Sequence, residues 1–373
     1  MGRTAASVSS VLGLGIVLFL GGCADAGVTP NARVESDLAE LAKAALEAKN
    51  AALVSDQGPS RSYSINSESY AGAIQGDLSA IAARRAALRR EGHSYTGFTT
   101  AVDVLRSEVR ENEATLSATE HTVLSQVVRD VSGVPSTTEY VQEHEFRFAK
   151  RNGAWYLLED RLINTLGSKD PFADSVHLEP VAIPREDAEW EIRASQAESY
   201  SHPDAAFRSA LAAGESVSKS AVVWYAYQYW QNYNPKYRKF ANDCTNFVSQ
   251  AMRHGGWSQN IGYALYKYPT VWWYDGVTQS WSWVNANVWF GWVSTRPRGR
   301  FTSDFSRLVP GDVVQADWDL DGIVDHTMIV TAKDGAGKLY LTYHSSNTKD
   351  RRFDDIRASL PRAAYYGWSL YGS

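Results

Sequence analysis

The chain is poor in cysteine, with only Cys23 and Cys244 in 373 residues. This scarcity excludes a small fold held together by several disulfides. Cys23 has a separate explanation at the N-terminus, given below, so Cys244 has no disulfide partner. In an exported protein a lone thiol is either buried or used in chemistry. Cys244 is therefore the first candidate functional residue.

Glutamate is absent from residue 216 onward, where 17 Lys and Arg stand against 12 Asp. The net charge of −5 thus divides into +5 for this part and −10 for residues 1–215, and 11 of the 13 tryptophans lie in the later part. Two halves of different composition predict two domains. No low-complexity tract, internal repeat or basic stripe is present, and the missing stripe excludes a nucleic-acid partner.

A long apolar run is missing apart from residues 11–20, which follow Arg3 and are too short to span a bilayer comfortably. The next four residues, LGGC at 20–23, resemble a bacterial lipobox. The resemblance implies a signal peptide over residues 1–22 and lipidation of Cys23. The protein would then be exported and anchored by lipid to the outer face of the bacterial cell membrane. The alternative is an ordinary secretion signal cleaved near residues 24–26.

The N-terminal half, residues 23–164, predicts helices followed by strands. Helical periodicity covers 35–54 and 70–90. Strand-like runs follow at 98–109, 114–127, 139–150 and 154–164, and Asn152-Gly153 predicts a tight hairpin between the last two. We expect a separate α+β domain with its helices on one face of an antiparallel sheet. Its three histidines show no spacing to a nucleophile or metal ligand: His93, His121 and His144. Residues 165–215, which contain four prolines, predict a linker.

The segment NDCTNFVSQ at 242–250 predicts a helix that begins at Cys244, with Asn242 or Asp243 as its cap. Apolar residues continue at helical spacing until Gly255 and Gly256 end the run. The unpaired N–H groups and positive dipole end of a first turn stabilise a thiolate and favour a nucleophile. The alternative is a small buried hydrophobic residue.

Three histidines of the C-terminal half are candidate bases. His254 lies ten residues along the same predicted helix, about 15 Å from Cys244, which is too far. His326 and His344 lie on two predicted strands joined by the turn DGAG at 334–337. A hairpin centred on Gly335 places the two histidines opposite each other on one face. A cysteine, a histidine and a polar orienting residue form the constellation of a thiol hydrolase.

Several short motifs carry a family resemblance over residues 219–368. They are NPKY at 234–237, NDCTNFVSQ at 242–250, GGW at 255–257, PGDVV at 310–314, DHTMIV at 325–330 and YHS at 343–345. This part of the chain resembles the putative amidase domain of actinobacteria and firmicutes, which is related to papain-like cell-wall peptidases and CHAP amidases. The resemblance implies a papain-like α+β domain over 216–373, with helices packed on a small antiparallel sheet.

The resemblance also implies roles for individual residues. Cys244 would be the nucleophile, His326 the base and His344 the third polar residue, for which Asn347 or an aspartate is the alternative. The expected protein is a cysteine-dependent, monomeric hydrolase of C–N bonds without a cofactor, acting at the cell surface on a peptide or peptidoglycan-like amide. A non-catalytic wall-binding module and an acyl transferase with the same Cys–His pair are the alternatives.

Two further features of the C-terminal half have competing interpretations. The aromatic-rich stretch 263–292 either stacks on a substrate or builds a core, and we favour the core. Asp317, Asp319 and Asp321 before Gly322 resemble the start of a calcium loop, but Met328 stands where its bidentate glutamate belongs. We therefore favour an acidic turn and predict no metal. A helix over 220–233 and three strands over 312–316, 327–331 and 339–343 complete the expected domain.

Overall fold

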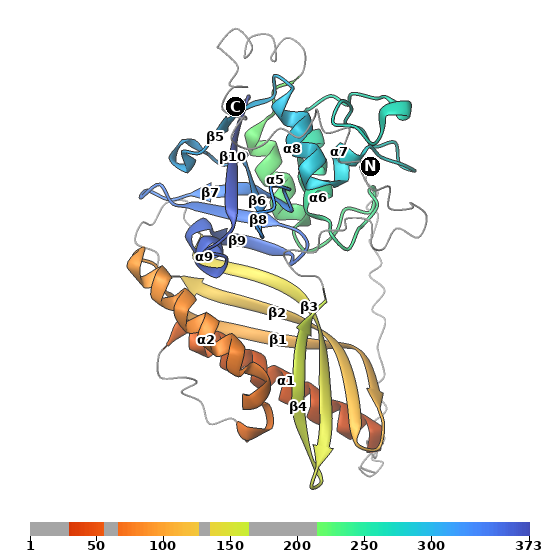
Figure 1. Ribbon diagram of the computed structural model, residues 1–373, viewed down its shortest axis with the longest axis vertical. Helices are drawn as coiled ribbons and strands as arrows, with labels where there is room; N and C mark the ends of the chain where they lie inside the picture. The colour runs from red at the N-terminus through yellow and green to blue at the C-terminus, as the bar shows by residue number, and fades with distance from the viewer. Residues whose placement is uncertain (1–29, 56–65, 127–134, 164–214) are drawn as a thin grey trace, which may run out of the picture.

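The computed structural model describes residues 30–55, 66–126, 135–163 and 215–373. The predicted signal peptide, Cys23 and almost all of the predicted linker lie outside these residues. The described residues form a mixed α/β structure with one large antiparallel sheet (Figure 1). No helix among them is both long enough and apolar enough to cross a membrane.

The first half contains two helices and four strands, and it confirms the elements expected from the sequence. Their bounds are α1 Pro30–Val54, α2 Glu68–Arg90, β1 Tyr95–Val109, β2 Glu113–Gln126, β3 Thr137–Arg151 and β4 Ala154–Leu162. Burial alternates along β2 with a period of two, as expected for a strand with one face against helices. Both turn residues between β3 and β4 have positive φ, 51° at Asn152 and 81° at Gly153, which is the geometry of the predicted hairpin turn.

The second half contains five α-helices, two short 3-10 helices and six strands in its described residues. In chain order they are α5 Lys219–Tyr229, α6 Cys244–His254, η3 Tyr263–Leu265, α7 Trp281–Val284, α8 Ala286–Ser294, β5 Gly299–Thr302, η4 Phe305–Arg307, β6 Val313–Asp317, β7 His326–Lys333, β8 Leu339–Tyr343, β9 Thr348–Arg352, α9 Phe353–Ser359 and β10 Ala364–Leu370. The three predicted strands correspond to β6, β7 and β8. The predicted helix over 220–233 ends earlier, at Tyr229.

The two faces of the C-terminal sheet have different covers. Helices α5 to α8 pack on one face around Phe247, Trp289 and Ile329. Helix α9 covers the other face, where Phe353 and Ile356 contact alternate residues of β6, β7 and β8. Because successive side chains of a strand point to opposite faces, neighbouring residues of β7 belong to different cores. This alternation decides where each histidine of the sheet lies.

One sheet runs through both halves of the molecule. Its strand order is β1-β2-β3-β9-β8-β7-β6-β10-β5, with β4 paired to β3. Strand β3 joins β9 through the pairs Glu139–Lys349 and Tyr140–Thr348. In Figure 1 the lower lobe, α1 to β4, meets the upper lobe at this pair of strands. The sequence predicted two separate domains, and the structure adds direct strand pairing between them.

A buried ion cluster on α9 reinforces this junction. The carboxylate of Asp355 accepts two hydrogen bonds of 2.5 Å from Arg84 of α2, and one each from Tyr95 and Arg351 at 2.9 Å. Burial alone would raise the pKa of Asp355, but Arg351 and Arg84 lower it well below its usual range. The two halves therefore share a charge cluster as well as a sheet.

Candidate functional site

Cys244 is the first residue of α6, as predicted, and it is buried. Its Sγ lies 3.6 Å from Oγ1 of Thr245, and this hydroxyl and the backbone of Thr245 and Thr327 act to lower the pKa of the thiol. Burial nevertheless raises the pKa of the Cys244 thiol. The hydrogen bonds of the helix start act in the direction expected for a nucleophile, and desolvation outweighs them in this closed arrangement.

Asp243 occupies the N-cap position of α6, yet its carboxylate caps no helix N–H. Its Oδ1 accepts hydrogen bonds from the Phe240 N–H and the Asn246 side chain. Its Oδ2 lies 2.6 Å from Nδ1 of His344. The sequence had identified Asp243 only as a possible cap. The structure instead makes it the residue that holds His344 beside the start of α6.

His344 follows β8 and lies on the face covered by α5 and α6. Its Nε2 is 2.7 Å from the carbonyl oxygen of Tyr229, so this nitrogen donates a hydrogen. The imidazole is stacked between two rings, Phe247 at 4.0 Å and Tyr233 at 4.2 Å between centroids. Both ring nitrogens and both ring faces of His344 are thus occupied in the closed site.

The predicted pairing of His326 with His344 is wrong, because the hairpin is not centred on Gly335. Its closing pair is Lys333 with Leu339, and a bulge at residue 331 then shifts the register by one residue. Ile329 consequently faces Thr342. Extended to the end of the hairpin, this register places residue 344 level with residue 327. A one-residue shift moves a side chain to the other face of the sheet, and this is the case for His326.

His326 points to the face that carries α9, away from α6. Its ring contacts Trp318 at 5.5 Å and Tyr343 at 5.2 Å, both on that face. The next residue of β7, Thr327, points the other way and bonds Thr245 of α6 at 3.0 Å. Cys244 and His326 therefore lie on opposite sides of the sheet. The structure bonds His344 to Asp243, the residue before Cys244, and it places His326 on the opposite face.

The surroundings of His326 are apolar. Nε2 is buried and has no hydrogen-bond partner within the described part of the chain. Burial lowers the pKa of His326 to about 3, so the imidazole is neutral at physiological pH. The structure gives no short path by which this ring removes a proton from Cys244.

Polar side chains line the sheet directly beneath Cys244. The hydroxyls of Thr245 and Thr327 are in contact, and Nε2 of Gln315 donates to Thr327 Oγ1 at 3.0 Å. The amide of Gln315 also accepts from the indole of Trp368 at 3.0 Å. These buried groups satisfy one another and fix the strands under the first turn of α6.

The tryptophans of the aromatic-rich stretch form a core, in agreement with the interpretation favoured above. Trp272, Trp283, Trp289 and Trp292 are fully buried between α6, α8 and the sheet. The exposed large side chains of the stretch lie in a separate loop at Tyr263, Leu265, Tyr268 and Val277.

The acidic turn after β6 contains part of the predicted cluster. Carboxylate oxygens of Asp317, Asp319 and Asp325 lie within 4.8 Å of one another. Both oxygens of Asp317 accept hydrogen bonds from backbone N–H groups of the turn, at Leu320 and Gly322. An acidic turn accounts for the aspartate spacing without an ion.

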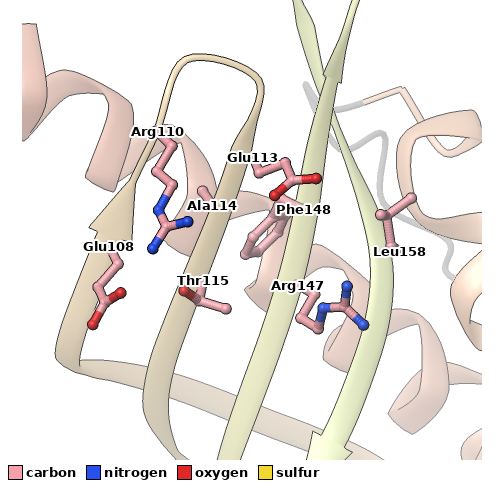
Figure 2. Close-up of a pocket in the computed structure, with 8 residues that line it drawn as sticks. All are labelled: Glu108, Arg110, Glu113, Ala114, Thr115, Arg147, Phe148 and Leu158. Carbon is pink, nitrogen blue, oxygen red and sulfur yellow. The ribbon is translucent and has the colours of Figure 1, made fainter.

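Three pockets in the described residues lie away from Cys244. One is an open hollow of about 230 Å³ on the N-terminal sheet, where Figure 2 shows Glu108, Arg110, Glu113 and Arg147 around Phe148. A second, of about 820 Å³, lies between α2 and α9, and a third, of about 320 Å³, lies at the junction of the two halves. None of the three has a cysteine or histidine in its lining.

The N-terminal half contains a charged cluster that sequence reasoning missed. Nδ1 of His144 lies 2.6 Å from Asp160, and its Nε2 lies 3.0 Å from Glu120. Lys49 of α1 bonds the same Asp160 at 2.6 Å. These residues are far apart in the sequence, and only the alternation of β2 and β3 hinted that 120 and 144 share the buried face. The cluster lacks a nucleophile.

Comparison with known proteins supports the resemblance in the C-terminal half. Residues 216–368 match the family model described as "Putative amidase domain". The chain is 29% identical over 163 residues to the uncharacterized protein YhbB of Bacillus subtilis (strain 168). The aligned residues are 42% of this chain and 51% of YhbB. The chain is also 33% identical over 138 residues to the uncharacterized protein YjcM of the same organism. Here the aligned residues are 34% of this chain and 30% of YjcM.

The chain therefore spans about half of one relative and less than a third of the other. No solved structure matches it. The family match indicates an amidase-type hydrolase activity for residues 216–368, that is, action on an amide bond.

Proposed function

We propose that the C-terminal half hydrolyses an amide bond by means of Cys244, and that His344, held by Asp243, is its acid–base partner. One observation carries this proposal. Cys244 begins α6 on the sheet face where the preceding residue, Asp243, bonds His344 at 2.6 Å. A nucleophile, an imidazole and a carboxylate that orients the imidazole are the parts that covalent amide hydrolysis requires.

The proposed reaction begins when Nε2 of His344 leaves the Tyr229 carbonyl, gives up its proton to water and turns to Cys244. Neutral His344, oriented through Nδ1–H by Asp243, takes the thiol proton, and the sulfur attacks the amide carbon. The amine leaves with that proton, and a thioester remains. Water then attacks the thioester while His344 accepts its proton, which frees the acid and regenerates the thiol. Backbone N–H groups in the first turn of α6 are the candidate oxyanion donors.

This proposal replaces His326 with His344 as the base, because the imidazole of His326 points to the other face. His326 keeps a structural role in the apolar layer under α9. Asn347, the alternative third residue, accepts a hydrogen bond of 2.9 Å from the Tyr233 hydroxyl and so belongs to the wall of the site.

A matched pair of variants tests the assignment. His344→Gln and His326→Gln are each compared with the parent protein and Cys244→Ala for release of amines from purified peptidoglycan, detected by mass spectrometry. We expect no turnover with Cys244→Ala. His344→Gln should lose about 10²–10⁴-fold, the usual contribution of an acid–base group, and His326→Gln less than about tenfold. The opposite order of the two histidine variants would return the role of base to His326.

A non-catalytic wall-binding module is the second candidate. It is favoured by the burial of Cys244 and by the occupied nitrogens of His344. In that case the parent and Cys244→Ala would bind peptidoglycan equally and neither would release amines. New cross-links in place of new amine termini would instead identify an acyl transferase that uses the same cysteine.

We also propose that the protein acts at the cell surface on a peptidoglycan-like amide and is anchored through lipid on Cys23. The LGGC motif at 20–23 supports this proposal. Metabolic labelling with a radioactive fatty acid should mark the parent protein and not Cys23→Ser. Equal labelling of both would exclude Cys23 as the attachment point.

A further inference from the structure

The segment between α5 and α6 covers the site just described. We call residues 230–240 the strap. Tyr233 of the strap stacks on His344 at 4.2 Å, and its hydroxyl donates to Asn347 at 2.9 Å. Burial raises the pKa of Tyr233 above its usual range, and the charges of Asp243, Glu143 and Cys244 contribute to the shift. The phenol ring therefore lies within the electrostatic reach of both Asp243 and Cys244, as a cover over the site.

Lys239 lies on the outer side of this cover. Its Nζ is 4.3 Å from the centre of the Tyr233 ring, so the ammonium, the phenol and the imidazole of His344 form one layered stack. Lys239 is exposed, and within the described residues it forms no ion pair with a carboxylate. A face-on contact between an ammonium and an aromatic ring is weak at an exposed position, so a ligand carboxylate can replace it.

The charges around the strap favour an anion at this point. Lys236, Arg238 and Lys239 are exposed within four consecutive residues. Arg238 donates through its side chain to the Val277 carbonyl. Asp243 faces inward and is bonded to His344. Glu143 of β3, in the N-terminal half, is the other acid whose charge acts on Tyr233.

We infer that Lys239 is a specificity residue, which binds a carboxylate of the amide substrate next to Cys244 and, in doing so, leaves Tyr233 free to uncover the site. The substrate class is thus an amide that carries a carboxylate close to the bond to be cut. The inference rests on the proposed role of Cys244.

Two alkylating reagents of nearly equal size test this inference without the natural substrate. Iodoacetate and iodoacetamide react with a thiolate in the same way, since the sulfur bonds the methylene carbon and iodide leaves. They differ in charge. The full chain with Cys23→Ser has Cys244 as its sole thiol, and intact mass spectrometry follows both rates at low salt. The quantity compared is the ratio of the iodoacetate rate to the iodoacetamide rate.

We expect Lys239→Gln to lower this ratio about fivefold. This is the factor that corresponds to attraction in water between the Lys239 ammonium and a reagent carboxylate about 4 Å from it. The effect should shrink at high salt because the charge is exposed. Lys267→Gln is the matched control, since Lys267 also lies over aromatic rings, Tyr266 and Trp281, but outside the strap. It should leave the ratio unchanged. Tyr233→Ala should raise both rates together.

An unchanged ratio in Lys239→Gln would overturn the inference, as would an equal drop in Lys267→Gln. Failure of both reagents to label Cys244 in the parent and in Tyr233→Ala would overturn it too, because the strap would then not control access. Alkylation needs no turnover. A protein that shows the charge preference but hydrolyses nothing would therefore contradict the proposed function and leave the anion site standing.

Discussion

The N-terminal and C-terminal halves each bury a histidine in their sheet, and they shift its pKa in opposite directions. His144 lies between Asp160 and Glu120; burial alone would lower its pKa, but the two carboxylates raise it to about 9. His326 lies against Trp318 and Tyr343 without a carboxylate, and burial lowers its pKa to about 3. The difference comes from the neighbours and not from the depth of burial.

The comparison also shows that a shifted pKa does not identify a site in this protein. His144 has the large upward shift, yet its cluster has no nucleophile. His344 shares the same kind of contact, a carboxylate at 2.6 Å from Nδ1, and differs because that carboxylate is followed in the chain by Cys244. Perturbed groups are more frequent at functional sites, but structural ion clusters perturb pKa values as well.

The largest effect is expected where the halves meet. Asp355→Ala removes the buried carboxylate that pairs Arg84 and Arg351, and it leaves two partly buried guanidinium groups without this partner. We expect a loss of about 3–5 kcal/mol in the free energy of unfolding, the usual result of breaking a buried ion pair. Urea unfolding followed by circular dichroism measures it.

Asp354→Ala is the control for this prediction. Asp354 is the neighbouring residue of α9, is more exposed than Asp355, and pairs with the buried Arg352 and the half-buried Lys338. Its removal should cost less than that of Asp355, because Asp354 bonds no residue of α2. Equal losses in the two variants would show that the cluster at Asp355 is not what joins the halves.

The second prediction concerns the pH dependence contributed by His144. Its pKa is higher in the folded protein, about 9, than in the unfolded chain, about 6.5. The stabilisation is therefore complete below pH 6.5 and is lost as the pH rises through 9. It should amount to about 3 kcal/mol, at 1.36 kcal/mol for each unit of pKa. Urea midpoints at pH 6 and pH 9.5 should differ in the parent and much less in His144→Gln.

His121→Gln is the matched variant for His144, because it removes a half-buried histidine from the same sheet. Its pH dependence should follow that of the parent. A His144→Gln protein whose stability still falls steeply towards pH 9.5 would contradict the assignment of the raised pKa to this cluster.

Much of the fold could be predicted from the sequence, because the signals are local. Helices α1 and α2, strands β1 to β4 and the Asn152-Gly153 turn follow from periodicity and turn chemistry. The start of α6 at Cys244 follows from the same reasoning. The pairing of β3 with β9 could not be predicted in this way, since Glu139 and Lys349 are 210 positions apart and neither carries a local signal for the contact.

The arrangement of the site was predicted in part. The roles of Cys244 and His344 stay predictions, and the structure places both residues on one face of the sheet. The predicted pairing of His326 with His344 depended on a hairpin register that one bulge at residue 331 overturns. A bulge inserts a single residue, so every side chain beyond it changes face. Nothing in the sequence of β7 marks that position, and for the same reason Tyr233 and Asp243 were missed as neighbours of His344.

The smallest predicted effect concerns the pH dependence of stability that His326 contributes. Its folded pKa of about 3 lies below the unfolded value of about 6.5, so the parent loses stability as the pH falls below 6.5. His326→Leu does not lose stability in this way, because leucine does not titrate. It also removes a buried nitrogen that has no hydrogen-bond partner in the described structure. At pH 7 the variant should lie within about 1 kcal/mol of the parent. Lowering the pH to 5 should raise the free energy of unfolding of the variant, measured relative to the parent, by about 2 kcal/mol.

Urea midpoints at both pH values test this. His254→Leu, which replaces an exposed histidine of α6, is the control and should show no such gain. Parallel pH curves for the parent and His326→Leu would mean that this imidazole reaches water or a partner, and the contrast with His144 would then fail.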